Sequence, residues 1–180
     1  TDIGVIQNGY PRRSVHNSDI GGIALNFRMP DVLALAIGGG TKVTFNNSGE
    51  ALIGPESCGH EFTKKAEVFG GDTLTMTDVS CILNEMEIVE SSKENFSIDA
   101  KTALGIQQVT VNSILQGINL MKGDKEDLDV FVVGGGASLG KKCAAKIPKY
   151  FDVANAYGAA LAEISLTVDT VESVKDRKEV

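Results

Sequence analysis

Asp129-Val-Phe-Val-Val-Gly-Gly-Gly-Ala-Ser-Leu-Gly-Lys-Lys-Cys-Ala-Ala-Lys-Ile-Pro148 is the stretch that decides the fold of this chain. Residues 130–133 are β-branched or aromatic, which predicts a short buried strand. Three glycines at 134–136 follow at once, and they allow both a sharp turn and a close approach to the backbone. Residues 137–147 predict a helix that ends before Pro148. The stretch therefore predicts a strand, a glycine turn and a helix in succession.

A helix that begins directly after a glycine turn offers free backbone N–H groups and the positive end of its dipole to an anion. We therefore interpret the turn at 134–136 as a candidate nucleotide site. The alternative is a tight turn between strand and helix that binds nothing, because glycine turns are common at such junctions. The stretch by itself leaves both interpretations open.

Two well-known phosphate motifs do not fit this turn. The dinucleotide fingerprint G-x-G-x-x-G requires a third glycine where this chain has Leu139. The Walker A pattern fits residues 135–142 except at its last position, where Lys142 replaces the hydroxyl residue that holds Mg²⁺. We reject both motifs and retain nucleotide binding as the hypothesis.

Composition limits the class of protein. The 180 residues fit a single domain, residues 1–180, and an apolar fraction of 42% suffices for a core. The net charge of -7 argues against nucleic acid or an anionic membrane as the main partner. Three widely spaced cysteines indicate reduced thiols in a cytoplasmic protein, and two isolated histidines do not suggest a zinc site. No secretory signal or membrane span is apparent.

The first third of the chain predicts a β-meander broken by glycine turns. Residues 1–7 predict a strand that enters a turn at Asn8-Gly9, with residues 12–17 as its partner. Residues 31–37 predict an apolar strand before a second run of glycines, and residues 42–45 and 51–53 predict another hairpin.

The rest of the chain predicts mainly helices. Thr75 and Asp78 have the spacing of a capping box, before a short helix that reaches Leu83. Residues 98–121 predict the longest helix, and residues 153–166 predict a last helix rich in small side chains. A β-meander followed by helix, strand and helix predicts an α/β fold, a mixed sheet with flanking helices.

Seven short segments, in order along the chain, match one known family. They are Thr-Asp-Ile-Gly-Val at 1–5, Asn-Phe-Arg-Met-Pro-Asp at 26–31, Ile-Gly-Gly-Gly-Thr at 37–41, Ile-Gly-Pro-Glu-Ser at 53–57, Phe-Gly-Gly-Asp-Thr-Leu-Thr-Met-Thr-Asp at 69–78, Val-Val-Gly-Gly-Gly-Ala-Ser at 132–138 and Ala-Asn-Ala-Tyr-Gly-Ala-Ala at 154–160. The chain resembles the hydantoinase/oxoprolinase family, the ATP-dependent hydrolases of cyclic amides. That family is similar to the actin, Hsp70 and sugar-kinase superfamily, in which two related α/β lobes of ribonuclease H-like fold clamp ATP.

The resemblance implies that this chain is most of the second lobe. Residues 130–138 match the adenosine motif, and residues 154–162 match the second connecting helix, whose small side chains pack where the lobes hinge. Thr1-Asp2 matches the end of a phosphate loop whose glycines precede this chain. The expected partners are then the missing first lobe, a small cyclic-amide substrate, and a second subunit or another copy.

The resemblance also implies a set of site residues for ATP and Mg²⁺. The nucleotide would lie along two backbone segments and the end of the phosphate loop. The first segment is Gly134, Gly135, Gly136 and Ala137, and the second is Gly38, Gly39, Gly40 and Thr41. The end of the phosphate loop is Thr1. Asp2 is the candidate catalytic carboxylate and Mg²⁺ ligand, because it adjoins the phosphate loop. The alternative for Asp2 is an ordinary aspartate that closes a turn at a strand end.

Four further charged residues are left out of the predicted site. Asp78 is expected to start a helix and Asp31 to close a turn. Lys141 and Lys142 are expected to lie on a solvated helix face.

Three functions remain open at the level of sequence. The first is the nucleotide lobe of an ATP-dependent hydantoinase or 5-oxoprolinase, as in hydantoin utilization. The second is a lobe of a sugar kinase or chaperone-type ATPase; the segments at 54–57 and 69–75 favour the first function over this one. The third is a folded module that is inactive in isolation. Catalysis in this superfamily needs a closed cleft between two lobes, so we expect the isolated chain not to turn over substrate.

Overall fold

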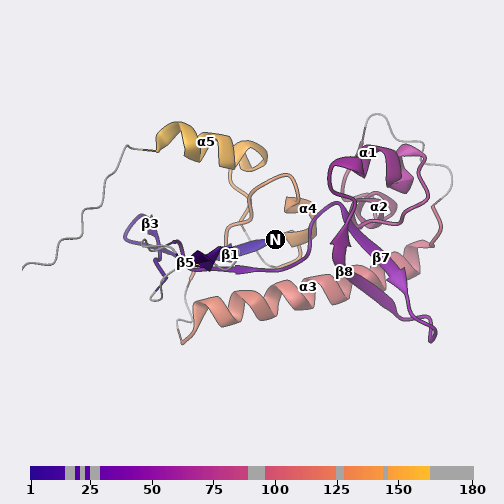
Figure 1. The fold of residues 1–180 in the computed structure, drawn as a ribbon, viewed down its shortest axis with the longest axis horizontal. Coiled ribbons are helices and arrows are strands. Elements are labelled where there is room, and N and C mark those ends of the chain that lie inside the picture. Colours follow the sequence, from indigo (N-terminus) through magenta and orange to yellow (C-terminus); the bar gives the residue numbers. More distant parts are fainter. Residues whose placement is uncertain are drawn as a thin grey trace, which may run out of the picture.

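The computed structural model describes residues 1–14, 19–20, 23–24, 29–88, 96–124, 128–143 and 146–162. Helix α3 (Ala100–Lys122) runs along one side of the molecule, and most of the strands and shorter helices lie above it (Figure 1). Its N-cap is Asp99, whose carboxylate accepts a hydrogen bond from the backbone N–H of Thr102 at 2.8 Å, and its C-cap is Gly123. The predicted helix over 98–121 is confirmed to within two residues.

The N-terminal strands form antiparallel pairs. Strand β1 (Asp2–Gly4) pairs with β6 (Val32–Ala34), and β2 (Ile6–Gln7) pairs with β3 (Tyr10–Pro11). The turn between β2 and β3 is Asn8-Gly9, where both residues have positive φ, 52° and 83°, as a two-residue hairpin turn requires. The predicted turn is therefore confirmed. A further antiparallel pair is formed by β4 (Asp19–Ile20) and β5 (Ile23–Ala24).

The second predicted hairpin is also present. Strand β7 (Thr41–Phe45) pairs with β8 (Ala51–Ser57), and Oδ1 of Asn46 accepts hydrogen bonds from the N–H groups of Ser48 and Glu50 in the turn. Three short helical segments follow, which are η1 (Gly59–Glu61), α1 (Phe62–Lys65) and η2 (Glu67–Phe69).

Helix α2 (Met76–Ile82) begins with the predicted capping box. The fully buried carboxylate of Asp78 accepts hydrogen bonds from the N–H of Thr75 at 2.6 Å, from its hydroxyl at 2.7 Å and from the N–H of Val68 at 2.7 Å. Burial raises the pKa of Asp78, although these hydrogen bonds act in the opposite direction. Asp78 therefore starts a helix, as expected.

The sheet differs from the prediction in detail. The described strands form four separate antiparallel pairs rather than one mixed sheet, and residues 130–133 are not a strand of any of them. Phe131 makes only an isolated parallel bridge to Lys146, with hydrogen bonds from Val132 N to Lys146 O and from Lys146 N to Val130 O. Phe131 is 59% exposed, so the apolar run lacks the covering on both faces that a buried strand has. The prediction of a buried central strand at 130–133 is therefore wrong.

The helices after the glycine turn are shorter than predicted. Helix α4 (Ala137–Gly140) has four residues instead of reaching 147, because Lys146 is extended and pairs with residues 130–132. Helix α5 (Ala154–Leu161) follows η3 (Phe151–Val153), and it contains no buried residue. Its small side chains therefore do not pack closely within the described part of the chain. The predicted continuation from 163 to 166 lies outside the described residues.

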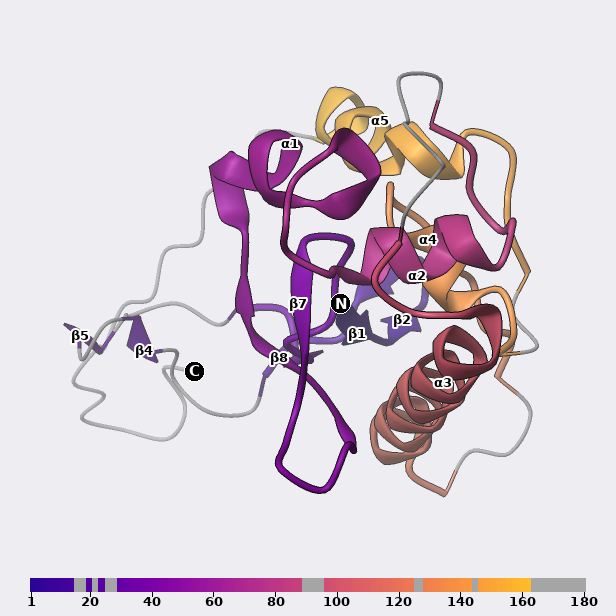
Figure 2. The same cartoon turned by 90° about the vertical axis from the view of Figure 1, so that its right-hand side faces the viewer.

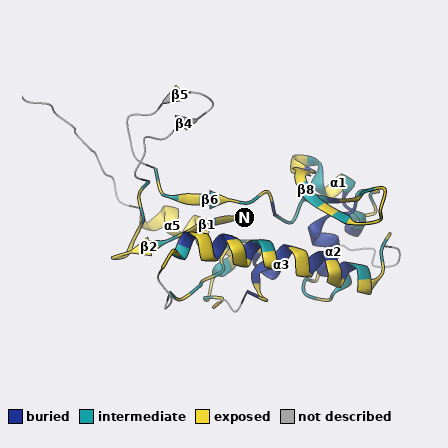
Figure 3. Ribbon diagram, turned by 90° about the horizontal axis from the view of Figure 1, so that it is seen from below, coloured by how far each residue is buried: buried dark blue, intermediate teal, exposed yellow. Residues whose placement is uncertain are grey.

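Helix α3 connects two hydrophobic clusters, and Figure 3 shows buried and exposed residues alternating along it. Its N-terminal half packs with α2, α4 and β7, and α2 and α4 lie next to each other above α3 (Figure 2). Its C-terminal half packs against β1, where a Cβ on Gly117 would lie only 2.6 Å from Cδ1 of Ile3. The glycine therefore permits close contact of helix and strand.

The three cysteines are buried, and no disulfide joins them in the described part of the chain. Within the described part of the chain, no helix has the length and apolarity needed to cross a membrane.

Candidate functional site

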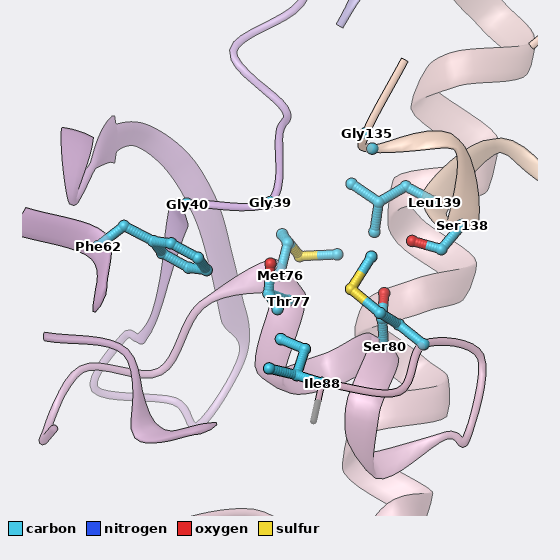
Figure 4. Close-up of a pocket in the computed structure, with 12 residues that line it drawn as sticks. Gly39, Gly40, Phe62, Met76, Thr77, Ser80, Ile88, Gly135, Ser138 and Leu139 are labelled. Atoms are coloured by element: carbon cyan, nitrogen blue, oxygen red, sulfur yellow. The ribbon is translucent and has the colours of Figure 1, made fainter. Parts of the chain in front are cut away.

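Two glycine turns that are far apart in the sequence meet at one pocket of about 280 Å³. Gly39 and Gly40, just before β7, lie on one side, and Gly135 lies on the other (Figure 4). Gly136, just before α4, also lines the pocket. The start of α2 lies between them. The structure thus brings together the two backbone segments that the sequence predicted as nucleotide contacts.

The side chains around the pocket are apolar or carry hydroxyl groups. Among the described residues, no charged side chain lines it. Such a slot, with few polar groups in an apolar lining, is typical of small-molecule sites. The lining side chains are Phe62, Met76, Thr77, Ser80, Met86, Ile88, Ser138 and Leu139.

The first glycine turn has a packing role within the chain. The N–H of Thr77 donates a hydrogen bond to the carbonyl oxygen of Gly39 at 2.9 Å. A Cβ on Gly39 would lie 2.7 Å from Oγ1 of Thr77, and a Cβ on Gly40 would lie 3.2 Å from Oγ of Ser57. Thr41 closes the turn, because its hydroxyl oxygen accepts a hydrogen bond from the N–H of Gly38 at 2.8 Å. These glycines are needed for close approach of the turn to α2 and β8.

The second glycine turn differs from the first. Gly134 has φ of 94°, a conformation that favours glycine, and its N–H donates to the carbonyl oxygen of Phe151 at 2.6 Å. Gly135 and Gly136 do not have positive φ, and nothing among the described residues lies within 4 Å of a Cβ built on either. Neither backbone conformation nor packing within the described chain requires glycine there. The open space above them suits a group that comes from outside.

The first turn of α4 completes this side of the pocket. Ala137 is buried, and its N–H donates a hydrogen bond to the carbonyl oxygen of Gly134 at 3.1 Å. Ser138 is only 8% exposed, and its hydroxyl oxygen has no hydrogen-bond partner among the described residues. Buried polar atoms in folded proteins normally have a partner, so this hydroxyl requires an explanation.

Thr1 and Asp2 lie at a different groove. This groove, of about 750 Å³, lies between β1, the C-terminal half of α3 and residues 128–133. The hydroxyl of Thr1 donates to the carbonyl oxygen of Ile37 at 2.6 Å, which links Thr1 to the residue before the first glycine turn. Asp2 is exposed and pairs with Ala34, and it does not line the pocket of the glycine turns. Among the described residues, no group of three histidine, cysteine, aspartate or glutamate side chains is placed to hold a metal ion.

Two of the charged residues left out of the predicted site, Asp31 and Lys142, form ion pairs within the chain. Asp31 forms an ion pair with Arg12 at 2.7 Å. Lys142 forms an ion pair with Glu85 at 3.1 Å and donates a hydrogen bond to Oε1 of Gln107, which in turn donates to Glu85. Lys142 therefore ties the segment after α4 to α3, although it is exposed to solvent as expected.

Sequence reasoning did not find several of these residues. Gln107 is 4% exposed, and a polar side chain on the buried face of a predicted helix was the one available signal for it. Phe62, Met86 and Ile88 enter the pocket only through the tertiary fold, and no motif marks them.

A comparison with models of known protein families shows the family of this chain. A family model described as hydantoinase/oxoprolinase matches residues 1–103, which is more than half of the chain. The chain belongs to the hydantoinase/oxoprolinase family. The matched range contains the first glycine turn and α2, whereas the second glycine turn of this family member follows it.

A solved structure supports the fold of this hydantoinase/oxoprolinase family member. The nucleotide-free structure of acetone carboxylase, from work on the mechanism of ATP-dependent acetone carboxylation, aligns with a TM-score of 0.66 and 16% identity. The alignment covers 89% of this chain and 27% of that chain, so this chain spans about a quarter of its length. The similarity of the two folds confirms the predicted α/β class. No curated protein matches this chain.

Proposed function

We propose that this chain is the nucleotide-binding lobe of an ATP-dependent enzyme that opens the ring of a cyclic amide or imide. The observation that carries the proposal is the meeting of the two glycine turns at one pocket. Gly135 and Gly136 have no reason within the described chain to be glycine, and a ligand lying against the backbone supplies one. Membership of the hydantoinase/oxoprolinase family supports the reaction type.

The residues present fit a bound nucleotide. The turn at Gly135 and Gly136 leaves space that a Cβ would fill, and the apolar slot beside it has hydroxyl groups but no charge among the described residues. ATP, when bound, supplies the phosphoryl group that activates the ring carbonyl toward water. The role of the chain is then to position the nucleotide and to neutralise its charge with backbone N–H groups.

Asp2 is the proposed Mg²⁺ ligand of this lobe. Mg²⁺ at phosphate sites is typically held by one or two carboxylates and by the phosphates themselves. The exposed carboxylate of Asp2 meets this requirement, and Thr1 links its strand to the first glycine turn through Ile37. Phosphates that extend from the pocket toward this strand would approach Asp2.

The remaining expectations of the proposal concern the complete enzyme. The groups that read the cyclic amide belong to a first lobe outside this chain, and the cleft closes only when both lobes are present. The isolated chain is then expected to have no ring-opening activity. We also expect a cytoplasmic enzyme that forms a complex with another subunit or another copy.

The decisive test of nucleotide binding is Gly135→Val in the complete protein. We expect the fold to tolerate this change, because Gly135 has no positive φ and no described neighbour within 4 Å of a Cβ. Calorimetric titration with Mg·ATP is expected to show affinity reduced by roughly tenfold or more, about 1.4 kcal/mol. Thermal unfolding without nucleotide is expected to be unchanged.

Gly105→Val is the matched control. Gly105 lies in α3 and also has open space around a Cβ, but it does not line the pocket. This variant is expected to bind Mg·ATP as the wild type does. If the wild type and a folded Gly135→Val variant bind Mg·ATP equally well, the second turn does not contact the nucleotide.

The reaction is tested by phosphate release from ATP in the presence of candidate substrates. Release that depends on hydantoin or 5-oxoproline, together with ring-opened product, is the expected result. Release that depends only on a sugar, or only on acetone under carboxylation conditions, would contradict the proposed substrate class. The isolated chain in the same assay is expected to release none.

A further inference from the structure

The exposed face of α3 carries no charge along most of the helix. From Thr102 to Met121 the sequence has no lysine, arginine, aspartate or glutamate, although 23% of the whole chain is charged. Exposed residues nevertheless recur along the whole helix (Figure 3). Between these limits they are Leu104, Gly105, Gln108, Val109, Asn112, Leu115, Gln116, Asn119 and Leu120. The solvent face of a surface helix is normally rich in charged side chains, so we expect this face to be covered in the working protein.

Amide side chains lie along the middle of this face, and apolar side chains lie at its edges. With about 3.6 residues per turn, Gln108, Asn112 and Gln116 follow one another close to the centre of the exposed arc. Leu104 and Leu120 lie at opposite edges, where they are 52% and 75% exposed. Removal of this apolar surface from water favours association. The partner must also pair with the row of amides, because a buried amide without hydrogen bonds is costly.

The residues on this face are arranged symmetrically about Asn112. Residues at equal separations before and after Asn112 are alike in kind, and these pairs are Gln108 with Gln116, Val109 with Leu115, and Leu104 with Leu120. The remaining pair, Gly105 with Asn119, is unlike, but the open space around a Cβ on Gly105 leaves room for an amide of a partner. When two such helices pack antiparallel about a two-fold axis at Asn112, the members of each pair share a layer across the contact.

We propose that α3 packs antiparallel against α3 of a second copy of this protein, about a two-fold axis at Asn112. A contact of this symmetry requires a face that complements itself. Amides both donate and accept hydrogen bonds, so like amides can pair across the axis. The lack of charge also matters, because each chain has a net charge of -7 and a charged face would add to the repulsion between copies. The inference does not depend on the nucleotide or on the reaction.

The size of the face limits the strength of this contact. A helix of this length extends about 34 Å and is about 10 Å wide, whereas stable complexes bury roughly 800 Å² per partner. We therefore expect a dimer with a dissociation constant of about 1–100 µM, in equilibrium with monomer. Sedimentation velocity of the complete protein over a concentration series that spans this range measures the equilibrium.

Two double variants separate the antiparallel pair from other arrangements. In Gln108→Lys/Gln116→Glu, each introduced lysine shares a layer with a glutamate of the other copy, so the dimer is expected to persist or tighten. In Gln108→Lys/Gln116→Lys, each layer holds two lysines, and the affinity is expected to fall roughly tenfold or more. The second variant is less acidic than the wild type, so overall charge would act in the opposite direction. Both positions are exposed, and thermal unfolding checks that both variants fold.

Asn112→Cys tests the position of the axis. Residue 112 lies opposite its own copy in the proposed pair, so the two introduced thiols come within reach of a disulfide. Oxidised glutathione is expected to link two copies of this variant. Gln108→Cys is the matched control, because its two copies lie on opposite sides of the axis, too far apart to be bridged. The three native cysteines are buried.

Every other outcome contradicts the proposal. A wild type that stays monomeric over the whole concentration series would overturn it. Equal weakening of association by both double variants would mean a parallel contact or a different partner for α3. If neither double variant changes the affinity, the copies meet through another surface. Cross-linking of Gln108→Cys but not of Asn112→Cys would exclude an axis at residue 112.

Discussion

The ammonium nitrogen of Lys142 lies 3.1 Å from Oε1 of Glu85, and both side chains bond to the buried amide of Gln107. Lys142 occupies the last position of the near-match to the Walker A pattern. Its partners are nevertheless protein groups, so it holds the segment after α4 against α3. This arrangement assigns Lys142 a structural role.

We expect Lys142→Met to lower the free energy of unfolding by about 1–2 kcal/mol, because Gln107 and Glu85 lose a charged partner. The ATP affinity of the folded variant is expected to differ from that of the wild type by less than twofold. Urea denaturation and calorimetric titration measure the two effects. Lys141→Met, at the neighbouring exposed position, is the control and is expected to change neither. Loss of ATP binding in a fully folded Lys142→Met variant would show that the lysine contacts phosphate.

The contact between Gly39 and Thr77 predicts a second result. A Cβ on Gly39 would lie 2.7 Å from Oγ1 of Thr77, so in Gly39→Ala either the Thr77 side chain must rotate or α2 must move away from the turn. The expected cost is about 1–3 kcal/mol in the free energy of unfolding. The double variant Gly39→Ala/Thr77→Ala is expected to recover much of this cost, since the hydroxyl that clashes is absent. Strict additivity in this double-mutant cycle would mean that the two residues do not interact.

Substitution by alanine at two glycines of α3 is expected to change the stability of the chain in opposite directions. Gly117→Ala is expected to destabilise the chain, because its Cβ would lie 2.6 Å from Cδ1 of Ile3. Gly105→Ala, on the same helix with open space around it, is expected to stabilise by about 0.5–1 kcal/mol through helix propensity. Thermal unfolding of the two variants tests the pair. Stabilisation by both would show that α3 does not pack closely on β1.

The buried carboxylate of Asp78 predicts a pH dependence. Asp78→Asn is expected to destabilise by about 1–3 kcal/mol at neutral pH, because an amide cannot accept hydrogen bonds from all three donors. Burial raises the pKa of Asp78 in the folded chain above its unfolded value. The stability due to this shift is therefore fully present below the unfolded pKa and is lost as pH rises through the folded pKa.

Urea denaturation of the wild type and of the Asp78→Asn variant at a series of pH values tests the direction of this pH dependence. The stability difference between them is expected to be largest in acid and to decline as the pH rises past the ordinary aspartate range. Asp72→Asn is the control at an exposed position nearby. A difference that grows with rising pH would mean that hydrogen bonding, not burial, dominates the pKa of Asp78.

Local sequence determined the elements whose interactions are short in range. The hairpin at Asn8-Gly9 follows from residues that tolerate positive φ, and the capping box of α2 joins Thr75 to Asp78 within one turn. Helix α3 follows from its apolar period and its N-cap at Asp99. The family, and both glycine turns as candidate contacts, were likewise predictable from short motifs.

The tertiary structure alone decided what depends on distant partners. Residues 130–133 have the composition of a buried strand, but a strand is buried only if other elements cover it, and Phe131 remains exposed. Helix α4 ends early because Lys146 pairs with residues 130–132. The shared pocket of Gly39 and Gly135 arises because α3 packs with both α2 and α4, and such long-range packing leaves no periodic signal in the sequence.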